Sequence, residues 1–535
     1  MTNAASSTPD CASTLPSRRP TRNSIQIWIV LAVTLLFAIN TGWRLFALPM
    51  WGDEVRTWRD SVGGRSYDEI LRWVHNKDHA PLGHLLTKAS ADLFGTDAPW
   101  ALRLPSYLFG LVCVPLGYLL GRSVWNSRAG VLMAVMIAVD VTLTQQAQLS
   151  RMYTMLMAFM LAALCAAAWT LRSNARLERK PEDAQQPLRS RVLQALAMGL
   201  ALAGALWSHF AATSIVLAVL LMGVILLFKP SSRSAGVVFL AGVFLALAAA
   251  SQGLIKLASM AGREKLPYDK DRDALEQLLL ACQTLIGNSP LAILLFGIAM
   301  YGLFLIATCR RSLGTLLMLM TGLMLVNLFI AANYRHIEGA RYLLGFLPVA
   351  WLGLAVVNDV LWQDRRLWLA QGCMALFVAG VAFQFSRNIV PAIHPQAYFL
   401  RETAAVLPSL GYSPDQALIF APVEPQRTSA LYYRLPQNSD LQKRIYDAWR
   451  AKNVSRNTLR RGRPEVLWVI AVTPSRERQE GTVNDGFGQA DAAARCYGHV
   501  LDRHRLPTKW EERQISILKI TPTSLDIWSP NGTPR

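Results

Sequence analysis

Two adjacent carboxylates, Asp53 and Glu54, stand directly after the first apolar run of the sequence. If that run crosses a membrane, the pair lies at the membrane surface. A carboxylate held there can accept a proton from a hydroxyl group that attacks an electrophile presented by a lipid. The alternative is a solvated acidic pair at a helix end, because short motifs often match by chance.

A second polar cluster follows in the same loop, within residues 76–86. It contains Lys77, Asp78, His79 and His84 around a proline, just ahead of a predicted helix. A cation at this place could hold a phosphate through charge-assisted hydrogen bonds. The cluster could equally be a capped surface turn, in which His84 simply packs.

Three further charged residues lie near the ends of apolar runs. Arg151 and Arg341 fall at ends that the topology places outside the cell, where positive charge is not favoured. Each could bind a phosphate, or could serve as an interfacial arginine or a member of a solvated ion-pair cluster. Asp140 could be a second acidic site residue or a partner of Arg151.

The composition indicates that these residues are positioned by membrane helices. The 535 residues are 52% hydrophobic and 17% charged, whereas soluble domains carry roughly 25% charged residues. A lipid core needs about 20 apolar residues per helix, and eleven runs qualify, so we expect a mainly α, polytopic membrane protein. The runs are approximately 25–43, 101–120, 129–145, 152–171, 192–207, 211–228, 235–254, 289–308, 313–331, 342–357 and 367–385.

The formal net charge of +19 is largely an orientation signal. Three arginines precede the first run, so the positive-inside rule places the N-terminus in the cytoplasm. Alternation then makes every connection with clustered Lys and Arg cytoplasmic, and eleven spans leave the C-terminal part outside a bacterial inner membrane. The expected parts are a tail (1–24), a transmembrane domain (25–386) with a long first outer loop (49–100), and an extracytoplasmic domain (387–535).

The outer domain has a different pattern. Short apolar runs at 417–421, 466–472 and 515–520 predict strands. Helix-like stretches at 403–407 and 441–452 accompany them, which is typical of a small α/β domain. No internal repeat is visible, which weakens the case for a transporter with two similar halves.

Several motifs, taken in order, resemble the protein O-mannosyltransferase-like family. This family belongs to the GT-C class of integral-membrane glycosyltransferases, which also includes aminoarabinose transferases acting on lipid A. The resemblance covers roughly residues 45–350. Its motifs are the acidic pair, His79–Gly83, Arg103–Ser106, Tyr118–Arg122, Ser150–Tyr153 and Ala340–Leu344.

The resemblance implies a sugar donor on a polyprenyl phosphate and an inverting transfer at the outer face, with Asp53 as general base and Glu54 assisting. The acceptor would be a lipid, glycan or protein hydroxyl. Donor-phosphate contacts would come from His79, Arg151, Tyr153, Arg341 and Tyr342, with possible loop contacts from Asp78, Lys265 and Arg272. Some relatives carry a lysine where this chain has His79 or His84, and neutral histidine is a weaker phosphate partner near pH 7.

Other functions stay open at the level of sequence. A lipid-linked sugar transporter or flippase, or a non-catalytic membrane protein that binds glycans, would need no general base at Asp53. The mixed charges of residues 259–277 could be a solvated face rather than a donor-covering loop. Asp53 and Glu54 could bind a divalent cation, although two adjacent residues supply too few ligands for a dedicated site. No motif indicates nucleic acid, a nucleotide sugar or a nicotinamide cofactor.

Overall fold

The structure, a computed structural model, describes most of the chain between residues 22 and 388 and short segments beyond. The chain divides into two compact units, one formed by Met1–Ala47 with Thr57–Ala392 and the other by Leu48–Arg56 with Ile393–Arg535. The described residues are 22–47, 52–62, 65–74, 80–179, 188–260, 291–334, 344–363, 367–388, 407–411, 417–421, 431–433, 467–474, 498–506 and 513–522.

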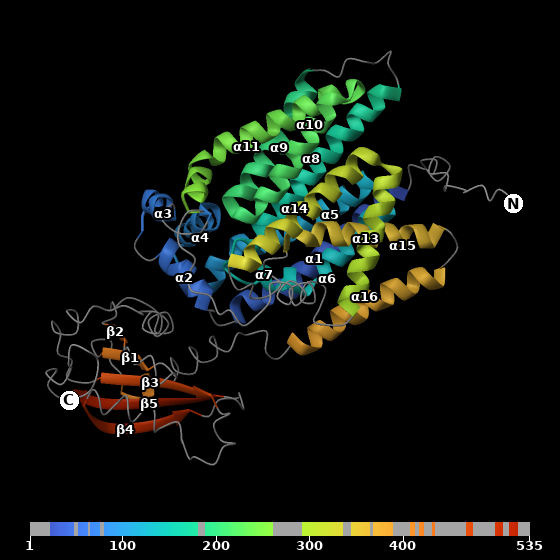
Figure 1. Cartoon of the computed structure of the whole chain (residues 1–535). Coiled ribbons are helices and arrows are strands. Elements are labelled where there is room, and N and C mark those ends of the chain that lie inside the picture. Colours follow the sequence, from blue (N-terminus) through green and yellow to red (C-terminus); the bar gives the residue numbers. More distant parts are fainter. Residues whose placement is uncertain are drawn as a thin grey trace. The chain divides into compact units, whose positions relative to one another are not determined.

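Each of the eleven predicted apolar runs lies mostly in helix (Figure 1). Six described helices are long and apolar enough to cross a membrane, and a bent pair makes seven. Three shorter apolar helices add to these, so a polytopic α-helical membrane protein is confirmed, whereas the count of eleven spans stays a prediction. The helices are α1 (Arg22–Ala47), α2 (Gly52–Ser61), α3 (Tyr67–Val74), α4 (Pro81–Phe94), α5 (Pro99–Val124), α6 (Ser127–Val139), α7 (Val141–Ala147), α8 (Tyr153–Arg179), α9 (Leu188–Ser208), α10 (Thr213–Phe228), α11 (Arg233–Met260), α13 (Leu291–Cys309), α14 (Arg311–Tyr334), α15 (Leu347–Gln363) and α16 (Leu367–Asn388), with 3₁₀ turns η2 (Phe210–Ala212), η3 (Pro230–Ser232) and η5 (Pro408–Leu410).

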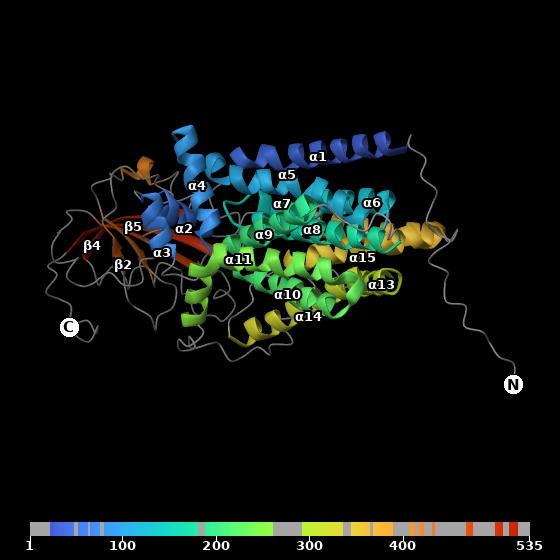
Figure 2. The same cartoon turned by 90° about the horizontal axis from the view of Figure 1, so that it is seen from above.

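The long helices pack side by side around one apolar core (Figures 1 and 2). α9 packs against α8 and α11, and α5 packs against α6 and α8. Small residues let these helices approach closely: a Cβ added to Gly121 of α5 would lie 2.8 Å from the Cα of Gly130 in α6. The Tyr118–Arg122 motif therefore includes a backbone contact that only glycine allows.

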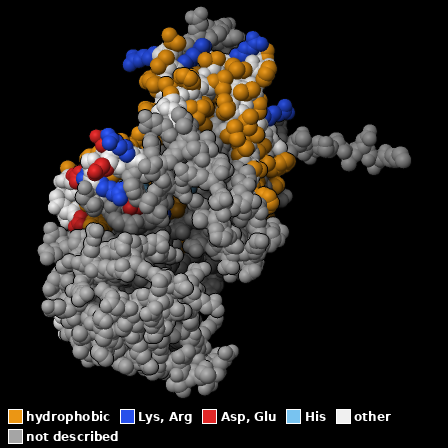
Figure 3. All heavy atoms as spheres, turned by 60° about the vertical axis from the view of Figure 1, so that its left-hand side comes forward, with side chains coloured by type: hydrophobic (Ala, Val, Ile, Leu, Met, Phe, Trp, Pro, Cys, Tyr) orange, Lys and Arg blue, Asp and Glu red, His pale blue; other side chains and the backbone are white. Residues whose placement is uncertain are grey.

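Large apolar side chains remain exposed on the outside of the bundle. Trp28, Leu200 and Phe244 are each about 70% exposed. Figure 3 shows hydrophobic side chains over the helices, with basic side chains near one end and a separate group of mixed acidic and basic side chains. Exposed apolar surface of this kind marks a membrane-facing surface rather than a water-facing one.

The predicted run 129–145 is one helix broken in two. α6 and α7 meet at 59° across Asp140, whose backbone is extended and whose Oδ1 accepts the Leu143 N–H at 2.7 Å. An aspartate side chain that caps a new helix competes with continuation of the old one. The apolar run thus contains a turn that its hydrophobicity does not reveal.

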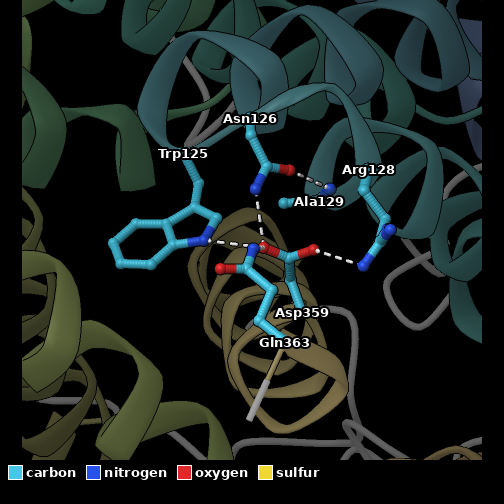
Figure 4. A network of polar contacts seen from close by, with 6 residues as sticks. All are labelled: Trp125, Asn126, Arg128, Ala129, Asp359 and Gln363. Carbon is cyan, nitrogen blue, oxygen red and sulfur yellow. Dashed lines mark hydrogen bonds and ion pairs between the residues drawn. The ribbon is translucent and has the colours of Figure 1, made fainter. Parts of the chain in front are cut away.

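At one end of the bundle, a polar network joins the α5–α6 connection to α15 (Figure 4). The carboxylate of Asp359 is fully buried. Its Oδ2 accepts hydrogen bonds from Trp125 Nε1 at 3.0 Å, Asn126 Nδ2 at 2.6 Å and Gln363 Nε2 at 2.6 Å, and its Oδ1 lies 3.6 Å from Arg128 Nη1. The sequence assigns both the α5–α6 connection and the end of α15 to the cytoplasm, and the network joins them at one end of the bundle.

The second unit contains a five-stranded mixed sheet with strand order β2-β1-β3-β5-β4. β1 and β3 are parallel, and the other neighbours are antiparallel. Three of these strands coincide with the predicted apolar runs, and β2 and β4 were not predicted. The expected helix at 441–452 lies outside the described residues, so the α/β class of this domain stays a prediction. The strands are β1 (Ala417–Ala421), β2 (Leu431–Tyr433), β3 (Leu467–Pro474), β4 (Gly498–Leu506) and β5 (Arg513–Pro522).

Candidate active site

A proline inside α5 fixes the loop helix α4 to the bundle. Pro105 has no N–H, so the carbonyl of Ala101, four residues earlier, loses its helical donor. The hydroxyl of Ser90 in α4 donates to that carbonyl at 2.6 Å. The Arg103–Ser106 motif therefore provides an acceptor that positions α4.

The same motif also holds the end of α1. Arg103 is fully buried, and its Nη1 donates to the Leu45 carbonyl at 3.0 Å. Leu45 lies in the last turn of α1, where backbone carbonyls have no helical donor. α1 leads directly into the segment that carries the acidic pair, so Arg103 has a structural role near the site.

The His79–Gly83 motif meets the Ser150–Tyr153 motif through the start of α4. A Cβ on Gly83 would lie 2.9 Å from the Cβ of Met152, so the residue at this contact has to be small. One turn further along α4, the hydroxyls of Thr87 and Ser150 are 3.4 Å apart. Two motifs that are distant in sequence are thus in direct contact.

Ser106 fixes the backbone of Arg151. The Ser106 hydroxyl donates to the Arg151 carbonyl at 2.6 Å, and the Arg151 N–H donates to the same hydroxyl oxygen at 3.2 Å. The Thr154 hydroxyl donates to the Ser106 carbonyl at 2.8 Å. Two other motifs therefore contact the segment that carries Arg151, and one of them fixes the Arg151 backbone.

The Arg151 side chain lies among groups from three helices. Its Nη1 donates to Thr57 Oγ1 of α2 at the long distance of 3.5 Å, and its guanidinium carbon lies 5.8 Å from the Tyr153 ring centroid. The His209 ring also packs against the Tyr153 ring, with the two ring centroids 5.6 Å apart. A partly exposed cation is thus presented beside two aromatic rings.

His209 is a site residue that the sequence analysis missed. It follows α9 directly, and its Nδ1 accepts the Ala211 N–H at 3.0 Å. Burial, and then the positive charge of Arg151, lower its pKa to about 4, so the imidazole is neutral at physiological pH. The available signal was a histidine at the end of an apolar run, on the same predicted side of the membrane as Arg151.

α2 carries the acidic pair at its start and contacts α4 further along. Asp53 and Glu54 lie in its first turn. Glu54 is buried, with 1% of its surface exposed. Further along, Ser61 Oγ lies 2.8 Å from His84 Nδ1, and Trp58 Nε1 donates to Asp97 at 2.7 Å. His84 therefore packs and holds α2, as one of the two sequence interpretations allowed.

Asp140 has a structural explanation. Besides capping α7 through Leu143, its side chain is hydrogen-bonded to Trp351 of α15. Arg151 is not among the partners recorded for Asp140 within the described residues. The structure therefore does not show the pair of Asp140 with Arg151 that the sequence left open.

Several predicted site residues lie outside the described residues: Asp78, His79, Lys265, Arg272, Arg341 and Tyr342. Of Asp53, the structure describes the helical backbone only. Within the part of the chain that is described, no three His, Cys, Asp or Glu side chains form a group that could hold a metal ion.

Residues 78–257 match the sequence model of the dolichyl-phosphate-mannose-protein mannosyltransferase family. This stretch contains the converging motifs around Arg151. The chain is a polyprenyl-phosphate-sugar glycosyltransferase, similar over this stretch to that family. The family resemblance inferred from the motifs is confirmed, and the enzyme class with it.

The fold of this glycosyltransferase is similar to that of ArnT from Cupriavidus metallidurans. The apo structure of ArnT gives a TM-score of 0.53 at 11% identity, covering 92% of this chain and 98% of ArnT. The ArnT structure bound to undecaprenyl phosphate gives a TM-score of 0.53 at 12% identity, with 93% and 98% covered. The glycosyltransferase has no significant sequence match among curated proteins.

Proposed function

We propose that this glycosyltransferase moves a sugar from a polyprenyl phosphate to an acceptor hydroxyl, with inversion at the anomeric carbon, on the outer face of a bacterial inner membrane. The contacts that two other motifs make with the segment carrying Arg151 carry this proposal. A cation fixed by its backbone, at the end of a membrane bundle and only partly exposed, suits a phosphate on a lipid.

In the proposed reaction, Asp53 is the general base. Its carboxylate takes the proton of the acceptor hydroxyl while the hydroxyl oxygen attacks the anomeric carbon. The bond between that carbon and the phosphate oxygen breaks, and the polyprenyl phosphate leaves with the electron pair. The place of Asp53 in the sequence supports this role, because it stands directly after the first apolar run, in the acidic pair that resembles the family motif.

Arg151 would stabilise the leaving phosphate. Negative charge grows on the phosphate as the glycosidic bond breaks, and a fixed cation lowers the energy of that state more than that of the bound donor. Tyr153, which packs beside the guanidinium, is placed to join it. Glu54 would orient the acceptor. Further proposed donor contacts are His79, Arg341 and Tyr342, with Asp78, Lys265 and Arg272 from loops; Asp140 would act only by shaping α7.

The orientation is part of the proposal. Arg151, His209 and Ser106 lie at helix ends assigned to the outside from sequence, and the Asp359 network lies at helix ends assigned to the cytoplasm. Among the described residues, these contacts join helix ends that the alternation of spans places on the same side of the membrane. This agreement supports the predicted topology, with the N-terminus inside and the C-terminal domain outside.

Asp53→Asn tests the assignment of the base. In a strain that lacks the gene, wild-type protein should restore a glycan mass difference in glycolipids or glycoproteins, and Asp53→Asn at equal membrane level should not. Glu69→Gln is the matched control, since Glu69 is an exposed carboxylate in α3 of the same loop that bonds only its own turn at Ser66. Full restoration by Asp53→Asn would show that Asp53 is not the base.

A further inference from the structure

His209 occupies one end of a short stack of side chains. The Tyr153 ring has the Arg151 guanidinium 5.8 Å from its centroid and the His209 ring 5.6 Å from it. Arg151 precedes α8 by two residues, Tyr153 is the first residue of α8, and His209 follows the end of α9. The stack therefore brings a cation, a phenol and an imidazole from two helices to one end of the bundle.

The imidazole is held in one tautomer. Its Nδ1 accepts the Ala211 N–H at 3.0 Å, so the ring proton resides on Nε2. The His209 N–H donates to Ala205 and its carbonyl accepts the Ala212 N–H, at 2.9 and 3.0 Å. The residue is thus fixed by its own turn, with Nε2–H as its one remaining donor.

His84 and His209 differ in burial and in their hydrogen bonds, and this difference distinguishes a packing histidine from a candidate binding histidine. His84 is buried and its Nδ1 is bonded to Ser61, as expected of a core histidine. His209 is only half-buried, and its Nε2–H has no acceptor among the described residues. A fixed, neutral donor beside a cation is suited to an anionic oxygen, because the cation attracts the anion and the donor orients it.

We propose that His209 donates its Nε2–H to an oxygen of the phosphate group that Arg151 binds. This inference rests on the proposed function, which assigns the donor phosphate to Arg151. His209 would be a binding residue that fixes the rotation of the phosphate about the guanidinium, and with it the direction in which the glycosidic bond points.

The first test measures binding of undecaprenyl phosphate to the full chain in nanodiscs. In His209→Asn the side-chain oxygen can still accept the Ala211 N–H, but the donor at the Nε2 position is lost. We expect its affinity to fall about 10- to 100-fold, the effect of losing a hydrogen bond to a charged group. His209→Gln reaches the Nε2 position with an amide N–H and should retain most of the affinity. Thermal unfolding of each variant checks that it is folded.

The second test needs no variant. Binding of an anion at hydrogen-bond distance should raise the pKa of the His209 imidazole by about 1 to 3, as opposite charges do. Nuclear magnetic resonance of labelled histidine in the wild-type chain would follow this with undecaprenyl phosphate. Inorganic phosphate at the same concentration should leave the pKa unchanged; an equal effect would overturn the assignment to a lipid-linked phosphate.

Comparison with Arg151→Gln separates the two proposals. If Arg151→Gln weakens binding while His209→Asn binds as the wild type does and the pKa of His209 does not move, His209 is not a phosphate ligand and the proposed function stands. If both variants bind with wild-type affinity, the donor phosphate is held elsewhere and both proposals are wrong.

Discussion

Replacing Gly83 by alanine should separate α4 from the turn that carries Arg151. The added methyl carbon would lie 2.9 Å from Met152 Cβ and 3.6 Å from Met152 Cα. Carbon atoms pack best about 3.5–4.0 Å apart, so the two segments must move apart by at least about 0.6 Å. The contact between Thr87 and Ser150, already 3.4 Å long, would then be lost.

The cost can be estimated in two parts. Overpacking of this size costs about 1–3 kcal/mol, and the better helix propensity of alanine offsets about 0.5–1 kcal/mol. We expect a net loss of about 1–2 kcal/mol in the free energy of unfolding. Because a displacement of 1 Å near reacting groups can cost about 100-fold in rate, turnover of the lipid-linked sugar should fall about tenfold.

The assay is sugar transfer and thermal unfolding of Gly83→Ala in detergent or nanodiscs. Gly322→Ala is the control, since a Cβ on this glycine of α14 meets nothing within 4 Å; it should leave turnover unchanged and stability equal or slightly higher. Wild-type stability and turnover in Gly83→Ala would refute the inference that this close contact positions Arg151.

Three further predictions follow from the described contacts. Ser90→Ala should destabilise the protein by about 1–3 kcal/mol, because the Ala101 carbonyl loses its hydrogen-bond donor. Adding Pro105→Ala should recover much of this stability, because alanine restores the helical N–H. Thermal unfolding of the single and double variants, compared in a double-mutant cycle, tests the coupling. Asp359→Ala should cost about 3–5 kcal/mol because three N–H donors and a cation lose their buried acceptor, and unchanged unfolding would contradict the network in Figure 4. The pKa of His209 is lowered from 6.5 in the unfolded chain to about 4 in the folded one, so the unfolded chain binds more protons between these pH values. The free energy of unfolding should therefore fall by less than about 3 kcal/mol as the pH drops from 6.5 through 4. Chemical denaturation of His209→Asn should lack this part of the pH dependence.

Hydrophobicity predicted the helices well, because an apolar run of this length has no other way to satisfy its backbone in lipid. It did not predict the break at Asp140. Length and hydropathy average over a window, whereas a helix start depends on one side chain that accepts one N–H. The 59° bend between α6 and α7 is therefore a local event inside an otherwise continuous signal.

The order of the motifs predicted which residues share one end of the bundle. Gly83, Ser106 and Arg151 do meet there. The order of the motifs could not predict what each residue does. Gly83 and Ser106 act through packing and backbone hydrogen bonds, whereas Arg151 contributes a positive charge. Such roles depend on distances, which a linear pattern does not contain.

His209 shows the limit of motif reading. No short pattern surrounds it, and its neighbour Tyr153 belongs to another helix. The contact exists because α8 and α9 pack antiparallel and bring the start of one beside the end of the other. Residues that join a site only through helix packing need a structure, or a deliberate search of all polar residues on one predicted side.

The bond between Ser90 and the Ala101 carbonyl has a consequence for how this sequence can vary in evolution. A proline at position 105 creates the free acceptor, and a hydroxyl at position 90 uses it. The two positions should therefore change together: relatives that replace the proline can lose the hydroxyl at little cost, whereas relatives that keep the proline should keep a short donor opposite it. A pair of residues from a loop helix and a membrane helix would thus be inherited as a unit.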